Sequence, residues 1–278
     1  MVVRPMKRRQ KMKKLLCLLL VALLAISLVA CGGTADTETQ APETNAPETD
    51  APETDPVVEF DPSAKSEGVM TYAEYAAAEM DAEVVIEAYV QAHQSWWDNK
   101  VVVYLQDPDG AYFAYNLACS EEDAAKLTKG TKIKVTGYKG AFNGEIEILD
   151  GTFEFGEGTW VAEATDVTAL LGTDELINYQ NMFVSFKGMT VEASKDADGN
   201  DVAFLYKWNG TGADGDDLYF NVSVNGQTYN FTVESYLTGK GTDVYEAVKA
   251  LQIGDVIDME GFLYWYEGVN PHITAVSK

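Results

Sequence analysis

The sequence is poor in the residue types that most often carry catalysis and metal binding. It holds two histidines among 278 residues, His93 and His272, which are far apart and have no cysteine or histidine partner at ligand spacing. This argues against a zinc centre and against histidine-based catalysis. We also find no glycine-rich phosphate loop, nucleophile elbow or serine-lysine pattern, so we expect neither a cofactor nor an enzyme.

Basic residues are few and unevenly placed. The chain has 20 lysines and arginines against 44 aspartates and glutamates, and seven of the basic residues lie before residue 31. Without that segment, 13 basic residues would face 44 acidic ones, a net charge of −31. A surface so acidic repels phosphate backbones and favours solubility, cations and basic partners.

Residues 1 to 30 have the pattern of an export signal. A basic segment precedes an apolar run over residues 15–30, which is short for a membrane span. The end of this run, Leu28-Val29-Ala30-Cys31, resembles the lipobox of bacterial lipoproteins. The resemblance implies a diacylglyceryl group on Cys31, cleavage of the signal peptide before it, and a lipid anchor on the extracytoplasmic face of the cell membrane. A plain transmembrane anchor is the alternative.

Cysteine is scarce as well, with Cys17 inside the predicted signal, Cys31 at its end and Cys119 alone beyond it. The mature chain therefore has no internal disulfide to form, and its stability must come from packed cores. An acidic run follows Cys119, and negative charges raise the pKa of a thiol. We therefore interpret Cys119 as a packed structural thiol rather than a nucleophile.

Residues 31 to 68 are predicted to be a tether. They contain three pentads of the form Ala-Pro-Glu-Thr followed by Asn or Asp, which begin at residues 41, 46 and 51. Regularly spaced prolines and like charges predict a disordered, extended linker with too few apolar residues to fold. Its expected role is that of a spacer between the lipid anchor and the folded part.

One stretch of the chain occurs twice. Residues 127–138, LTKGTKIKVTGY, return as residues 251–262, LQIGDVIDMEGF, with leucine, glycine, isoleucine, glycine and an aromatic residue at matching places. Each copy predicts the end of a short helix, a glycine turn and a strand with alternating apolar residues. A helix that leads into a strand in this way precedes the fourth strand of a five-stranded OB barrel.

We therefore predict a mainly β fold with two tandem five-stranded OB-like barrels, over residues 69–158 and 166–278, each with a short helix between its third and fourth strands. A capping box at Thr71 and Glu74 predicts a further helix before the first barrel. The second barrel has an enlarged loop, residues 192–217, with an expected strand inside it. The other expected elements are strands over 84–90, 101–106, 111–117, 133–138, 145–155, 202–208, 218–224 and 227–233, and helices over 120–127 and 242–251.

Aromatic residues gather in the loops where OB barrels hold their ligands, between strands one and two and between strands four and five. Rings at these places could stack on sugars or bases or seat a partner's apolar residues. Equally, they could plug the ends of the barrels or cement the barrels together. The candidate ligand-binding residues are Trp96, Trp97, Phe142, Tyr206, Trp208, Trp265 and Tyr266.

The enlarged loop also contains Asp196-Ala-Asp198-Gly-Asn200-Asp201, which resembles part of an EF-hand calcium loop. The pattern fails at its sixth position, where Asp201 replaces glycine, and at its twelfth, where Lys207 replaces glutamate. We favour a hairpin turn here, with weak calcium binding by Asp196, Asp198 and Asn200 as the alternative.

The folded region resembles the tandem OB-like barrels of bacterial cell-surface lipoproteins, which implies a non-catalytic binding or adaptor module with a protein or glycan partner. A second hypothesis is a single-stranded nucleic-acid-binding protein accessory to an extracellular nuclease. Its basic run, Lys126, Lys129, Lys132 and Lys134, is sparse for a phosphate track. A third is a component for glycan capture or hydrolysis, which would need paired carboxylates.

Overall fold

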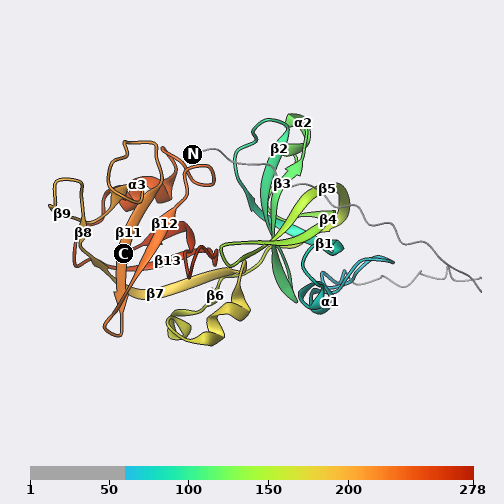
Figure 1. The fold of residues 1–278 in the computed structure, drawn as a ribbon, viewed down its shortest axis with the longest axis horizontal. Coiled ribbons are helices and arrows are strands. Elements are labelled where there is room, and N and C mark those ends of the chain that lie inside the picture. The colour runs from blue at the N-terminus through green and yellow to red at the C-terminus, as the bar shows by residue number, and fades with distance from the viewer. Residues whose placement is uncertain (1–59) are drawn as a thin grey trace, which may run out of the picture. The chain divides into compact units, whose positions relative to one another are not determined.

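The computed structural model describes residues 60–278. The predicted signal peptide, Cys31 and the tether up to residue 59 lie outside the described residues. Residues 60–278 belong to one compact unit, whose two halves are coloured from blue to green and from yellow to red in Figure 1. Among residues 60–278, no helix is long and apolar enough to cross a membrane.

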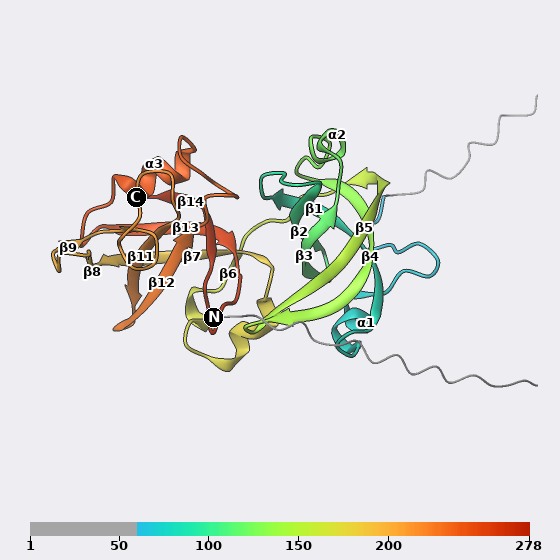
Figure 2. The same cartoon turned by 45° about the horizontal axis from the view of Figure 1, so that its top comes forward.

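The first five strands form a closed barrel in the order β1-β2-β3-β5-β4 (Figure 2). All its pairings are antiparallel except that of β3 with β5. This is the strand order of an OB barrel, and it confirms the prediction for the first barrel. The strands are β1 (Glu83–His93), β2 (Lys100–Asp107), β3 (Gly110–Ala118), β4 (Thr131–Phe142) and β5 (Glu145–Thr159).

Two short helices accompany this barrel, α1 (Tyr72–Ala77) before β1 and α2 (Glu121–Ala124) between β3 and β4. The predicted capping box at the start of α1 is confirmed, because Thr71 accepts from the backbone N–H of Glu74 and the Glu74 carboxylate accepts from that of Thr71. At the other end of α1, the buried Lys139 ammonium donates to three backbone carbonyl groups, those of residues 75, 76 and 78.

Seven of the other strands form what we call the second sheet, in the order β10-β11-β12-β14-β13-β7-β6, with an additional pairing of β11 with β7. A separate hairpin joins β8 to β9, and α3 (Asp243–Lys249) lies between β12 and β13 along the chain. Two 3₁₀ helices, η1 (Thr168–Leu170) and η2 (Asp174–Tyr179), precede β7. The strands are β6 (Thr165–Asp166), β7 (Phe183–Glu192), β8 (Ser194–Lys195), β9 (Asp201–Val202), β10 (Leu205–Tyr206), β11 (Leu218–Val224), β12 (Gln227–Val233), β13 (Val256–Phe262) and β14 (His272–Ser277).

The duplicated stretch has the same structure in both halves. Gly130 and Gly254 precede β4 and β13 with the same φ of +91°, a left-handed conformation that favours glycine. Further along, Gly137 and Gly261 lie at irregularities in the pairing of these strands with β5 and β14. A Cβ at either place would lie 2.8 Å from backbone atoms of the neighbouring strand, Leu149 O and Ile273 Cα respectively. The glycines of the repeat therefore mark two sites where neighbouring strands approach too closely for a larger side chain.

The folded part begins earlier than the sequence predicted. The Lys65 ammonium lies 2.6 Å from a carboxylate oxygen of the buried Asp107 and 2.8 Å from the backbone oxygen of Glu87. The ring of Phe60 packs edge-on against Tyr89, with centroids 6.4 Å apart. Residues 60–68, which we assigned to the disordered tether, are thus held against the barrel. The last Ala-Pro-Glu-Thr pentad ends at residue 55, and a buried ion pair holds residues 60–68 in place.

Two other expectations, about elements within the folded part, were wrong. A single strand over residues 202–208 is replaced by β9 and β10, because β9 pairs with β8 whereas β10 pairs with β11. Lys207 then ends β10 with a left-handed φ of 63°. Phe142, expected in a loop, is the last residue of β4, where it pairs with Glu145.

Candidate ligand-binding site

The outer face of β2 and β3 is covered by the second sheet. Val102 and Tyr104 on β2 and Phe113 on β3 form a buried cluster with Phe183 and Phe262 of the second sheet. The ring of Tyr104 stacks on that of Phe262 with centroids 4.5 Å apart. The alternate residues of β2 point into the barrel core, so this strand is buried on both faces. In OB barrels the second and third strands carry the ligand, and in the first barrel that surface is used for packing.

Polar contacts fix this junction. The Tyr104 hydroxyl lies 2.6 Å from Nδ1 of His272, and the amide oxygen of Gln106 accepts from the backbone N–H of Phe183 at 2.8 Å. A carboxylate oxygen of Glu145 accepts from the backbone N–H of Trp265, also at 2.8 Å. Burial lowers the pKa of His272 to about 3, so its ring is neutral at physiological pH. The barrel and the second sheet therefore meet through a buried aromatic cluster and several hydrogen bonds between the two halves.

The corresponding face of the second sheet is open and hollowed. A cleft of about 530 Å³ lies over it. Its walls come from the enlarged loop through Trp208, from β11 through Tyr219, from the residue after β12, Glu234, and from the segment between β13 and β14. The barrel adds Gln94. The lining residues are Gln94, Trp208, Tyr219, Glu234, Tyr264, Tyr266, Asn270 and His272.

One carboxyl group lies among these rings. The Oε2 atom of Glu234 is buried and has no hydrogen-bond partner among the described residues. Burial, with the nearby charge of Asp217, raises the pKa of Glu234 to about 7. Burial of the Tyr219 hydroxyl and the charges of Asp217 and Glu234 raise the pKa of Tyr219 to about 12. The cleft therefore combines aromatic surface with a partly buried acid whose pKa lies well above its ordinary value.

Two of the seven predicted aromatic residues line this cleft. Trp208 is 69% exposed and Tyr266 is 46% exposed, so both keep ring surface free for a ligand. Phe142 lies beside Tyr266, with ring centroids 6.0 Å apart, and thereby brings the β4–β5 turn next to the β13–β14 segment. In the predicted pair of OB barrels, each of these two segments joins the fourth strand to the fifth, and OB barrels hold ligands beside that loop.

The other predicted rings lie elsewhere. Trp96 packs against the barrel core and donates its indole N–H to the backbone oxygen of Cys119 at 2.9 Å, which is a structural role. Tyr206 and Trp265 are partly buried against the core of the second sheet. Trp97 is 79% exposed and lines no part of the cleft.

Sequence reasoning missed Tyr219, Glu234 and Tyr264. Tyr219 lies on β11 and Glu234 directly follows β12, the two strands of the predicted hairpin around Asn225-Gly226. An OB barrel uses such strands for ligands, so their position could have indicated these residues. The unbroken apolar run over residues 101–105 could also have been used for prediction. Such a run is typical of a strand buried on both faces, and it indicates that the ligand face of the first barrel is covered.

The acidic stretch in the enlarged loop forms the hairpin turn that we favoured. Asp196 Oδ1 accepts from the backbone N–H groups of Asp198 and Asn200, at 2.9 and 2.8 Å, and this turn joins β8 to β9. Among residues 60–278, no group of three or more His, Cys, Asp and Glu side chains is arranged to hold a metal ion.

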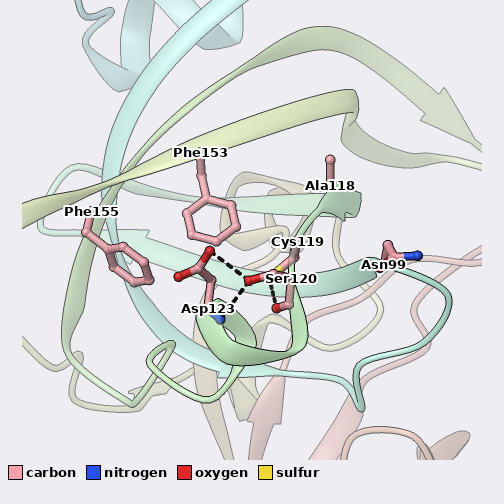
Figure 3. Close-up of a pocket in the computed structure, with 7 residues that line it drawn as sticks. All are labelled: Asn99, Ala118, Cys119, Ser120, Asp123, Phe153 and Phe155. Carbon is pink, nitrogen blue, oxygen red and sulfur yellow. Dashed lines mark hydrogen bonds between the residues drawn. The ribbon is translucent and has the colours of Figure 1, made fainter.

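A second cavity, of about 470 Å³, is lined by Cys119 and by the rings of Phe153 and Phe155 on β5 (Figure 3). The polar side chains of Cys119, Ser120 and Asp123 in its lining already make hydrogen bonds. The Cys119 thiol is buried and donates to the backbone oxygen of Ser120 at 3.2 Å, while burial and the charge of Asp123 raise its pKa. Ser120 and Asp123 hydrogen-bond to each other at the start of α2. The structure thus agrees with a packed, unreactive thiol.

The lysines considered for a phosphate track are largely engaged. Lys126 pairs with Glu122 and Asp123, each at 3.0 Å. Lys132 pairs with Glu87 at 3.0 Å, in a position that is mostly buried. The ammonium of Lys129 lies 4.9 Å from the ring centroid of Phe183. These contacts oppose a continuous basic surface for nucleic acid.

No protein-family model and no curated protein matches the chain. Solved structures give faint likenesses. The HINa domain of Ifi202 with 20-base-pair double-stranded DNA is 8% identical, with a TM-score of 0.33, over 70% of this chain and 98% of that one. A murine DNA-binding protein bound to double-stranded DNA is 10% identical, with a TM-score of 0.34, over 70% and 97%. A deletion mutant of the single-stranded DNA-binding protein from Thermus aquaticus is 12% identical, with a TM-score of 0.21, over 70% and 93%. At these scores the likenesses bear on neither the ligand nor the activity of this chain.

Proposed function

We propose that this protein is an exported, lipid-anchored binding module of the bacterial cell surface, built from two OB-like barrels, that takes its ligand in the aromatic cleft. Cys31 carries the lipid, and the Ala-Pro-Glu-Thr pentads separate the membrane from the folded part. The pairings β7–β11, β11–β12, β12–β14, β14–β13 and β13–β7 run in a ring, which supports a second barrel with the strand order of the first.

One observation carries this proposal. The cleft lies over β11, the end of β12 and the adjoining loops, where OB barrels hold their ligands, whereas the same face of the first barrel is packed against the second sheet. The two halves therefore have different roles. The first barrel connects the second one to the tether, and the second one binds the ligand.

Binding without catalysis fits the chemistry of the cleft. Of its lining residues, Glu234 is the one carboxylic acid, whereas the usual mechanisms of glycoside hydrolysis use two. Capture of a glycan without hydrolysis agrees with the aromatic walls. Single-stranded nucleic acid fits less well, because its phosphates would approach Glu234 on a chain with a net charge of −24.

A binding screen tests the proposal. The lipidated chain in detergent is titrated with neutral oligosaccharides, small organic cations and single-stranded DNA, as wild type, Trp208→Ala and Trp97→Ala. Both substituted tryptophans are largely exposed, but Trp208 alone of the two lines the cleft. We expect Trp208→Ala to weaken binding about tenfold, the loss of one stacking contact worth about 1–2 kcal/mol, and Trp97→Ala to leave it unchanged. Equal losses in the two variants would contradict the proposal.

A further inference from the structure

The cleft combines aromatic rings with a single acidic group and has no lysine or arginine in its lining. Four of the eight lining residues are Trp208, Tyr219, Tyr264 and Tyr266, and Glu234 is among the rest. Resting on the proposed function, we infer that the ligand of this cleft is a small organic cation, with an ammonium group of about the size of choline's.

The carboxylate supplies the first reason. An ionised carboxylate that is partly withdrawn from water needs a cation or several hydrogen bonds to offset its lost hydration. Glu234 Oε2 is buried and has no hydrogen-bond partner among residues 60–278. The nearest charge that perturbs it, Asp217, is also negative. Two lysines of this half, Lys240 and Lys249, both pair with Asp214. A cationic ligand would supply the missing counter-charge.

The rings supply the second reason. The face of an aromatic ring attracts a cation, most strongly when the cation loses its water, and several rings around one site add their effects. Trp208 and Tyr266 expose much of their ring surface at this cleft. Tyr264 stacks on His272 with centroids 4.2 Å apart, and His272 is fixed in turn by the Tyr104 hydroxyl. The wall behind the site is therefore rigid before a ligand arrives, which reduces the entropy lost on binding.

The volume and the overall charge agree with this assignment. A space of about 530 Å³ admits a small molecule rather than a folded partner. The acidic chain draws cations toward its surface and repels anions. A phosphate beside the ammonium group, as in a phospholipid headgroup, would meet the charges of Glu234 and Asp217, so the free cation is the expected form.

A pair of isosteric probes tests the charge directly. Choline and its uncharged carbon analogue 3,3-dimethylbutan-1-ol have nearly the same shape, and each is titrated calorimetrically into the full lipidated chain. We expect choline to bind at least tenfold more tightly than the analogue. Glu234→Gln should reduce this preference, because the charge of the carboxylate is lost and only the attraction of the rings remains. Glu267→Gln, which changes an exposed acid between β13 and β14 that does not line the cleft, is the control and should keep the preference.

The outcomes separate this inference from the proposed function. If the analogue binds as tightly as choline, or if only a neutral oligosaccharide binds and Trp208→Ala weakens it, the cation assignment is overturned and the cleft stands as the binding site. If no ligand in the screen binds more weakly to Trp208→Ala, both the cation assignment and the proposed function are contradicted. Phosphocholine is a third probe: tighter binding than choline assigns a lipid headgroup, and weaker binding assigns the free cation.

Discussion

Glu145 gives the sharpest prediction about stability, because its carboxyl group is buried at the junction between the barrel and the second sheet. Its residue is 0% exposed. One oxygen accepts from the backbone N–H of Trp265 at 2.8 Å and from the amide of Gln180 at 3.3 Å, and the other has no partner among the described residues. Burial raises the pKa of Glu145 from 4.5 to about 8. The substitution Glu145→Gln keeps the shape of the side chain and removes its ionisation.

The direction of the effect follows from this raised pKa. The folded chain holds the Glu145 proton more tightly than the unfolded chain, so the stability linked to it is complete below pH 4.5 and is lost as the pH rises toward 8. Each pH unit in that window costs about 1.4 kcal/mol. Between pH 5 and pH 8 the wild type should lose about 3 to 4 kcal/mol of unfolding free energy relative to Glu145→Gln.

Urea unfolding followed by tryptophan fluorescence, at half-unit steps from pH 5 to pH 8.5, measures this difference. The control is Glu154→Gln, which changes an exposed carboxylate on the same strand, β5, and should give a curve parallel to that of the wild type. The two test curves, wild type and Glu145→Gln, should diverge with increasing pH. If they stay parallel, Glu145 is not a buried neutral acid, and the account of the junction is wrong.

Two further predictions concern the segment before the barrel. Lys65→Met leaves the carboxylate of Asp107 buried without its cation and should cost about 3–5 kcal/mol in the same unfolding assay, whereas Lys195→Met, which removes a surface pair with Asp201, should cost less than about 1 kcal/mol. Similar costs for the two would show that residues 60–68 are not part of the folded unit. Cys31→Ala should abolish metabolic labelling by an acyl-chain analogue, and labelling that persists would contradict the lipobox assignment.

Much of the fold was predictable because local chemistry and the internal repeat point the same way. The Thr71 and Glu74 capping box, the Asn225-Gly226 hairpin and the strand order of the first barrel are all present. The glycines of the repeat mark turns and close crossings that no other residue fits as well. The start of the folded part was missed, because it depends on an ion pair between residues 42 positions apart, Lys65 and Asp107.

The site was predictable only in outline. Of the loop aromatic residues that we predicted, Trp208 and Tyr266 line the cleft. Whether a ring faces a ligand or a core, however, is decided by tertiary packing, as Trp96 in the barrel core illustrates. The covered face of the first barrel depends on contacts such as Tyr104 with Phe262, which pair residues from the two halves and leave little trace in either one alone.

The central claim is that ligand binds over the second sheet and not over the first barrel. The chain has five tryptophans, each with one indole N–H, so a ¹H–¹⁵N correlation spectrum recorded during titration with the ligand from the screen reports on both halves at once. We predict that the Trp208 signal shifts furthest, while those of Trp96 and Trp97 stay in place. Shifts at Trp96 or Trp97 with an unmoved Trp208 would contradict the account.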